Sequence, residues 1–393
     1  MLRKYAYFRN TLILKLISME VVFNKPFITG RETHHLARIA LSGKLSGNGA
    51  YTRICHDFFE KRFGFRKTLL TTSCTDALEM AAILCEISPG DEVIMPSYTF
   101  VSSANAFILR GAVIRFADTG PDYPNISPAE IRRLITEKTR AILVVHYGGV
   151  ACEMDEIMEI ARERNLLVVE DAAHAVDSFY KGKPLGSIGH FGTFSFHETK
   201  NIICGEGGML AINNERFVRR AEIIWEKGTD RAAFYRGEVD KYGWKDIGSS
   251  FLPSEITAGM LYAQLEAFES IQNARKALWS KYYSALKPLH DTGKVMLPEV
   301  PEYATINGNM FYILAGSPSE RDALMDFLKS KGIQAVFHYL PLHSSDYYRD
   351  KHDGSDLPNT RKFSGCIIRL PFFNEMKEEE VNYVVEEISR YFR

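Results

Sequence analysis

Cysteine is scarce in this sequence, and the few cysteines follow no disulfide or metal pattern. The 393 residues contain six cysteines, which form neither a C-x-x-C pair nor the spacing of a small disulfide-linked scaffold. This distribution excludes a disulfide framework and is typical of proteins from a reducing compartment. We therefore expect a cytoplasmic protein.

An excess of charge of one sign is also missing. The formal net charge is −1, and lysines and arginines are interspersed with acids. Proteins that bind nucleic acid carry a basic face, so this balance argues against such a partner.

Long hydrophobic runs are absent as well. The apolar stretch at residues 11–17 is short and interrupted by Lys15, and no small-residue cleavage site follows it. A membrane span needs ~20 apolar residues. We expect neither an anchor nor an export signal, and we assign residues 1–20 to an N-terminal extension.

What the chain does contain is enough apolar sequence for a large core. Hydrophobic residues make up 46% of it and charged residues 25%. Strand-like and helix-like segments alternate without internal repeats, and this rhythm predicts an α/β fold with a mostly parallel sheet covered on both faces. We expect a large domain over residues 21–270 and a smaller α/β domain over 271–393.

The predicted elements are as follows. Strands are expected at 67–71, 90–96, 113–117, 141–146, 166–171 and 205–213, and helices at 31–42, 52–63, 77–87, 127–136, 155–165 and 215–227. One long helix from 254 to about 286 should link the domains. The small domain should contain strands 310–314, 335–338 and 367–370, with helices 319–331 and 377–391.

The most informative residue is Lys200, in the stretch from Phe191 to Gly208. Alternating aromatics in Phe191-Gly-Thr-Phe-Ser-Phe196 predict a short buried strand, and Lys200 follows its end. Partial burial lowers the pKa of a lysine and gives the neutral amine that Schiff-base chemistry requires. The alternative is an ordinary solvated loop lysine.

Asp171 and His174 form a second candidate cluster. They follow the apolar run Leu166-Leu-Val-Val169, which reads as a central parallel strand. Active sites of open α/β sheets form at the carboxyl ends of such strands. Alternatively, Asp171 only caps the next helix.

A third candidate is the hydroxyl-rich segment Thr72-Ser-Cys-Thr75, which opens a helix-periodic run. Backbone N–H groups at a helix start can bind a phosphate, although Ser and Thr are also ordinary N-caps. The aromatic segment Pro96-Ser-Tyr-Thr-Phe100 follows. Together these pieces match pyridoxal phosphate, which needs an acid at its ring nitrogen, an aromatic face and a lysine.

With these motifs the chain resembles the DegT/DnrJ/EryC1/StrS family of sugar aminotransferases, within fold-type I of the pyridoxal-phosphate enzymes. The resemblance runs from about Val21 to the C-terminus and is carried by residues 146–155, 195–201, 246–250 and 336–343. It implies pyridoxal 5'-phosphate as the cofactor, a large domain with a mostly parallel sheet, and a smaller C-terminal domain.

The same segments are similar to the subgroup that converts dTDP-4-keto-6-deoxy-D-glucose to dTDP-4-amino-4,6-dideoxy-D-galactose with glutamate as donor. The gluco-configured product and amination at carbon 3 are the alternatives within the family. Neither the nucleotide-base contacts nor the pathway follows from the residues.

The resemblance also implies residue roles. It assigns Lys200 to the Schiff base and proton transfer, Asp171 to the pyridine nitrogen, and His174 to the neighbourhood of the pyridoxal hydroxyl. Phosphate contacts fall on Cys74, Thr75 and Ser195, and ring stacking falls on Phe100, with Tyr98 as competitor. Ser250 stands where the family usually has an asparagine, which the partner subunit of a homodimer donates to the cofactor phosphate. His338, Tyr339 and His343 are candidate contacts to the sugar or the diphosphate. The two histidines could equally be structural.

Two segments remain open. The polar, aromatic residues 228–248 are expected to contact substrate or a second subunit, or else to form an ordinary surface loop. His197 is expected to be a packing or supporting residue.

Two readings from other classes compete with the aminotransferase. A metal-dependent hydrolase could use His146, Asp171 and His174, although no H-E-x-x-H pattern supports it. A non-catalytic sensor with the pyridoxal-phosphate fold would keep the lysine and lose the donor chemistry.

Overall fold

The large domain is built on a seven-stranded sheet. The computed structural model describes residues 19–393, so the predictions for residues 1–18 lie outside it. The strand order is β1-β9-β8-β5-β4-β2-β3, and within this sheet β9 alone runs antiparallel to its neighbours. This confirms the mostly parallel sheet. The strands are β1 (Lys67–Thr71), β2 (Glu92–Pro96), β3 (Val113–Ala117), β4 (Thr139–Val145), β5 (Leu167–Asp171), β8 (Phe191–Ser195) and β9 (Gly208–Ile212).

Helices cover both faces of this sheet, because its strands are apolar on both sides. In β2, Ile94 points into one core while Val93 and Met95 point into the other, as the two-residue period of a strand requires. One face is covered by α3 (Ala50–Phe63), α6 (Pro128–Leu134), α7 (Met154–Arg164) and α10 (Glu255–Glu266), and the other by α4 (Cys74–Leu84), α5 (Val101–Ile108) and α8 (Val218–Trp225). Helix α2 (Glu32–Ser42) packs on α10.

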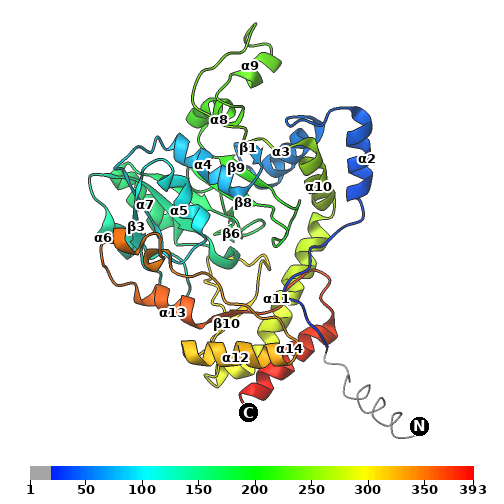
Figure 1. The fold of residues 1–393 in the computed structure, drawn as a ribbon, viewed down its shortest axis with the longest axis vertical. Coiled ribbons are helices and arrows are strands. Elements are labelled where there is room, and N and C mark those ends of the chain that lie inside the picture. The colour runs from blue at the N-terminus through cyan, green and yellow to red at the C-terminus, as the bar shows by residue number, and fades with distance from the viewer. Residues whose placement is uncertain (1–18) are drawn as a thin grey trace, which may run out of the picture.

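The predicted single helix over 254–286 is wrong, because the structure divides it into α10 and α11 (Phe268–Asp291). The break lies at Ala267, whose dihedral angles of −102° and 12° are not helical. Both helices bury apolar residues beside the break, such as Leu265 and Phe268, so the apolar periodicity continues across it. Figure 1 shows α11 running from the sheet toward the small domain.

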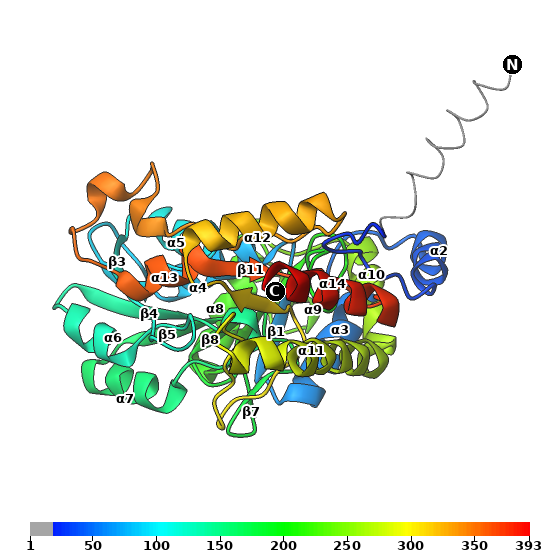
Figure 2. The ribbon, with the colours of Figure 1, turned by 90° about the horizontal axis from the view of Figure 1, so that it is seen from below.

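The small domain contains the antiparallel pair β10 (Tyr312–Leu314) and β11 (Ile367–Arg369). Figure 2 shows this pair between α12 (Pro318–Ser330) and α11, with α14 (Glu378–Tyr391) beside them. The predicted strand over 335–338 is wrong, since only one bridge, Val336 to Arg369, forms there. The chain then turns at Tyr339, whose φ of 36° ends an extended run.

The remaining elements are short. They are α9 (Arg231–Tyr235), α13 (Pro358–Cys366), the hairpin β6 (Phe179–Tyr180) and β7 (Lys183–Pro184), and the 3₁₀ turns Tyr147–Gly149, Glu215–Phe217, Leu342–Ser344 and Arg349–Lys351. Helix α9 lies in the segment 228–248, which projects from the large domain beyond α8 (Figure 1). No helix between residues 19 and 393 is long and apolar enough to cross a membrane.

Candidate active site

A cavity of about 1090 Å³ collects most of the predicted site residues. It lies at the carboxyl ends of β5 and β8, where the start of α4 and a small-domain segment also meet. Parallel sheets place their sites at this edge. The lining residues named in the sequence prediction are Cys74, Thr75, Phe100, Asp171, His174, Ser195, Lys200, His338 and Tyr339.

The start of α4 offers unused backbone donors to this cavity. Ser73 is the N-cap, and its side chain accepts a hydrogen bond of 3.1 Å from the N–H of Asp76. Within residues 19–393, the N–H groups of Cys74 and Thr75 have no acceptor. Strand β9 lies directly beneath, since a Cβ on Gly208 would be 2.4 Å from the Cys74 nitrogen. These donors form an anion site at a helix N-terminus.

Asp171 ends β5, and two hydrogen bonds hold its carboxylate in place. One oxygen accepts a hydrogen bond of 2.7 Å from the Ser103 hydroxyl, and the other accepts one of 3.2 Å from the N–H of Ala173. Burial raises the pKa of this carboxyl, and the two hydrogen bonds and the charge of Lys200 oppose the rise. No α-helix follows directly after Asp171, so the helix-cap interpretation is wrong.

Lys200 follows β8 and lines the same cavity. The turn that carries it is closed by its own N–H, which donates to the carbonyl of His197 at 2.9 Å. Burial lowers the pKa of the Lys200 amine to about 8, with a further lowering from the guanidinium of Arg369, while Cys74 and Asp171 act in the opposite direction. A substantial neutral fraction at neutral pH distinguishes this amine from a solvated lysine.

An aromatic cluster joins the small domain to the cavity wall. The ring of His174 is parallel to that of Tyr339, with centroids 6.4 Å apart, and the Tyr147 hydroxyl lies 2.6 Å from Nδ1 of His338. Burial lowers the pKa of both imidazoles well below the usual value. Both rings are therefore neutral at physiological pH.

The two candidates for the stacking aromatic differ in position. Phe100 is the N-cap residue of α5, and its side chain is 56% exposed at the cavity. Tyr98 is fully buried, and its hydroxyl donates to the carbonyl of His338 at 2.9 Å. Of these two candidates, Phe100 lines the cavity and Tyr98 does not.

Three other candidates lie differently. His197 also lines the cavity with a side chain 40% exposed, so it is not a packing residue. His343 does not line the cavity, and its Nδ1 is 2.7 Å from the Ser97 hydroxyl. Ser250 is exposed, pairs with Glu226 at the base of the projecting segment, and does not line the cavity.

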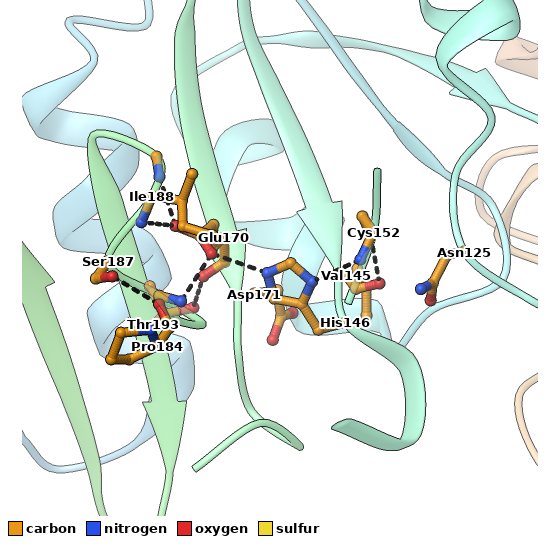
Figure 3. A network of polar contacts seen from close by, with 12 residues as sticks. Asn125, Val145, His146, Cys152, Glu170, Asp171, Pro184, Ser187, Ile188 and Thr193 are labelled. Atoms are coloured by element: carbon orange, nitrogen blue, oxygen red, sulfur yellow. Dashed lines mark hydrogen bonds and ion pairs between the residues drawn. The ribbon is translucent and has the colours of Figure 1, made fainter. Parts of the chain in front are cut away.

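His146 belongs to a buried network beside the site, which Figure 3 shows. Its Nε2 lies 2.9 Å from the Glu170 carboxylate, and its Nδ1 accepts from the N–H of Cys152 at 3.2 Å. Glu170 also accepts from the N–H groups of Gly186 and Ile188, each at 2.7 Å. Both ring nitrogens are thus used, so His146 has none left for a metal. Between residues 19 and 393 no group of His, Cys, Asp and Glu could hold one.

Sequence reasoning missed two residues of the cavity region, Ser103 and Arg369. Ser103 lies on α5, which was not predicted because the helix is only eight residues long. Arg369 lies on β11 and lines the cavity from the small domain. Its single charge within an apolar strand, Ile367-Ile-Arg-Leu370, was the available signal.

Comparisons with known proteins agree with this geometry. The model of the DegT/DnrJ/EryC1/StrS aminotransferase family matches residues 26–389. An uncharacterized protein of Methanocaldococcus jannaschii is 31% identical over 350 residues, which cover 87% of this chain and 90% of that protein.

Solved structures are similar over nearly the whole chain. The aminotransferase TlmJ of Streptoalloteichus hindustanus has a TM-score of 0.87 and 26% identity, covering 95% of this chain and 99% of its own. Spr1654 of Streptococcus pneumoniae, described as a sugar aminotransferase and solved in its PMP form, has a TM-score of 0.86 and 26% identity, covering 94% and 98%. It was also solved in its PLP form.

Proposed function

Because the chain belongs to the DegT/DnrJ/EryC1/StrS aminotransferase family, whose members use pyridoxal phosphate, we propose that it aminates carbon 4 of dTDP-4-keto-6-deoxy-D-glucose. Glutamate is the proposed donor, and dTDP-4-amino-4,6-dideoxy-D-galactose is the proposed product. The support for this substrate is the similarity of residues 146–155 and 195–201 to the 4-aminating subgroup.

The cavity has the groups that pyridoxal phosphate needs. The free N–H groups of Cys74 and Thr75, with the hydroxyl of Ser195, would hold the phosphate. Asp171 would hold a proton on the pyridine nitrogen, and Phe100 would cover one face of the ring. When bound, the cofactor supplies an electron sink for the carbanion at the reacting carbon.

One observation carries the proposed chemistry: an amine with a pKa of about 8 and a buried carboxylate line one cavity. The neutral Lys200 amine can attack an aldehyde carbon and can take a proton from the Cα of the donor. The same Nζ then returns a proton to carbon 4 of the sugar. Neutral His174 would act as a hydrogen-bonding group rather than as a charge.

A homodimer with shared sites fits the position of Ser250. This residue and the aromatic side chains of Tyr235, Tyr242 and Trp244 are exposed on or beside the projecting segment. A second cavity of about 960 Å³ lies at the base of this segment and extends to α2 and α3. A second copy of the chain would cover these surfaces and bring Ser250 to the cofactor phosphate of its partner.

The product decides the substrate assignment. Enzyme, keto sugar and glutamate are incubated, and the ring proton couplings of the product are read by NMR. A small coupling between the protons on carbons 3 and 4 indicates the axial galacto amine, and a large one indicates the gluco epimer. Nitrogen at carbon 3, or no product, contradicts the proposal. The Lys200→Ala variant serves as the control for uncatalysed amination.

A further inference from the structure

Asn201, the residue directly after Lys200, is held by three hydrogen bonds to buried residues. Its side-chain Nδ2 donates to Oε1 of Gln272 at 3.0 Å and to the carbonyl of Asn307 at 2.8 Å. Its Oδ1 accepts from Nδ2 of Asn309 at 2.9 Å. Asn201 itself is 4% exposed. Because both donor hydrogens and the oxygen of this buried amide have partners, the side chain has one preferred orientation, and it fixes the backbone beside Lys200.

Two partners of Asn201 are themselves bonded to the loop after β5. Asn307 donates from Nδ2 to the carbonyls of His174 and Val176, each at 2.7 Å. Gln272, on α11, donates from Nε2 to the carbonyl of Val176 at 3.3 Å. Both partners are almost completely buried. The amides therefore join the loop after β8 to the loop after β5 and to the helix that links the domains.

The third partner, Asn309, lies in a segment that α11 holds in place. Nε of Arg275 donates to the carbonyl of Gly308 at 2.8 Å, and Nη2 donates to that of Asn309 at 2.9 Å. Gly308 has a φ of 63°, and a Cβ on it would lie 2.6 Å from the carbonyl oxygen of Arg275. Only glycine allows the two backbones to approach so closely. Asn309 therefore reaches Asn201 from a fixed backbone.

The network bears on Lys200, because the amine lies at the end of a flexible four-carbon stem and can be directed only from a fixed backbone. Reacting atoms must come within about 3–3.5 Å of each other, and a misplacement of ~1 Å can cost ~100-fold in rate. Packing alone does not require an amide here, since the next two residues, Ile202 and Ile203, are buried and apolar. A fully bonded amide network specifies one arrangement more strictly than apolar contacts do.

We propose that Asn201 is a positioning residue for Lys200 and that Asn309 acts through it, so that the amide network sets the direction in which Nζ enters the cavity. The inference rests on the role proposed above for Lys200. Asn201 does not line the cavity, so it acts on a ligand only through the lysine. Its loss should therefore lower the rate at which Lys200 reacts and leave the affinity of the site for the cofactor unchanged.

Capture and binding of the cofactor separate these two effects. Pyridoxal phosphate is added to full-length enzyme from which it has been removed, and the growth of the visible band gives the capture rate. 4'-Deoxypyridoxine 5'-phosphate has no aldehyde, so its dissociation constant reports the site without the lysine reaction. For Asn201→Ala we expect the capture rate to fall about 100-fold and the dissociation constant to stay within about twofold. Borohydride reduction and peptide mapping identify the captured lysine.

Gln264→Ala is the matched control. Gln264 is also a buried amide, 1% exposed, whose Nε2 donates to the carbonyl of Phe27 at 2.9 Å and to Oε1 of Glu32 at 3.0 Å. It lies on α10 and does not line the cavity. Both variants lose buried hydrogen bonds, so both melting temperatures should fall by roughly 3 °C. The capture rate should fall only in Asn201→Ala.

Asn309→Ala tests the outer part of the network and removes one bond of three. We expect the capture rate to fall about tenfold, since an unpaired buried acceptor remains on Asn201. The double variant Asn201→Ala/Asn309→Ala should capture the cofactor no more slowly than Asn201→Ala, because Asn309 acts through Asn201. Losses that multiply would contradict this coupling. Asn309→Ala also provides the test if Asn201→Ala does not fold.

Three results would overturn the inference. They are capture rates within about threefold of the wild type in both single variants, equal losses of capture and of analogue binding, and a matching loss of capture in Gln264→Ala. The second and third would indicate a general structural role. A wild-type label on a lysine other than Lys200 would instead refute the role of Lys200, and the inference with it. No sugar enters these measurements, so the substrate assignment is tested separately.

Discussion

At the scale of single residues, the chemistry depends on two opposing effects of burial. Removal from water lowers the pKa of the Lys200 amine and raises that of the Asp171 carboxyl, so each charged form is disfavoured. The lysine needs its neutral form. The aspartate needs its charged form, and the Ser103 hydroxyl and the Ala173 N–H stabilise it.

The lowered pKa of Lys200 makes a measurable prediction. In cofactor-free enzyme, the rate at which pyridoxal phosphate is captured should follow the neutral amine. With a pKa of about 8, this fraction rises about tenfold from pH 7 to pH 9 and then levels off. An unperturbed lysine would give roughly a hundredfold rise without a plateau. Stopped-flow absorbance measures the profile, and Lys200→Ala is the control.

Asp171→Asn should keep the cofactor bound but slow the chemistry. The amide cannot hold a proton on the pyridine nitrogen, so we expect kcat to fall ~1000-fold or more, which is ~4 kcal/mol of barrier. Ser103→Ala removes one hydrogen bond to the same carboxylate and should raise the same barrier by ~1 kcal/mol. Steady-state rates and the visible band measure both. A loss within tenfold for Asp171→Asn would exclude the assigned role.

At the scale of elements, the end of β5 depends on the network around Glu170. This fully buried carboxylate is bonded to His146 and accepts N–H groups from residues 186–189, which tie β4 to β5 and to the turn before β8. Asp171 is the next residue, so its position depends on these bonds (Figure 3).

Glu170→Gln should therefore destabilise the protein although the change is nearly isosteric. The amide would place its own N–H₂ against backbone donors, and breaking a buried charge network costs ~3 kcal/mol. Glu163 is exposed and forms only a surface ion pair with Arg132, so Glu163→Gln should lower the free energy of unfolding by less than ~1 kcal/mol. Urea unfolding compares them, and equal midpoints would contradict the prediction.

At this scale the sequence predicted elements better than boundaries. The large-domain strands were found because they contain continuously apolar runs such as Leu166–Val169. The break at Ala267 was missed because it interrupts no apolar pattern, and α5 was missed because it is short. Within the cavity, Lys200 and Asp171 stood out by motif, but the bond from Ser103 to Asp171 joins residues 68 apart and has no local signature.

At the scale of the whole molecule, the proposed dimer can be tested by complementation. One inactive variant is Lys200→Ala, and the other replaces residues 228–248 by a flexible linker of equal length. If each site needs its own lysine and the partner's projecting segment, random mixing restores about a quarter of the wild-type sites. Unmixed samples are the controls. Activity in the linker variant alone, or none after mixing, would contradict shared sites.

The pairing of β1 with β9 has a consequence for biosynthesis. Lys67 lies opposite Ile212, so the edge strand next to α4 waits for a partner 145 residues further along the chain. The entropic free energy of closing such a loop is ~2 kcal/mol higher than that of closing a ten-residue hairpin. Pairings between distant segments also slow folding. On the ribosome, β1 and the start of α4 therefore emerge long before β9, with their apolar surface uncovered. Chaperone capture should concentrate on nascent chains that end before residue 212.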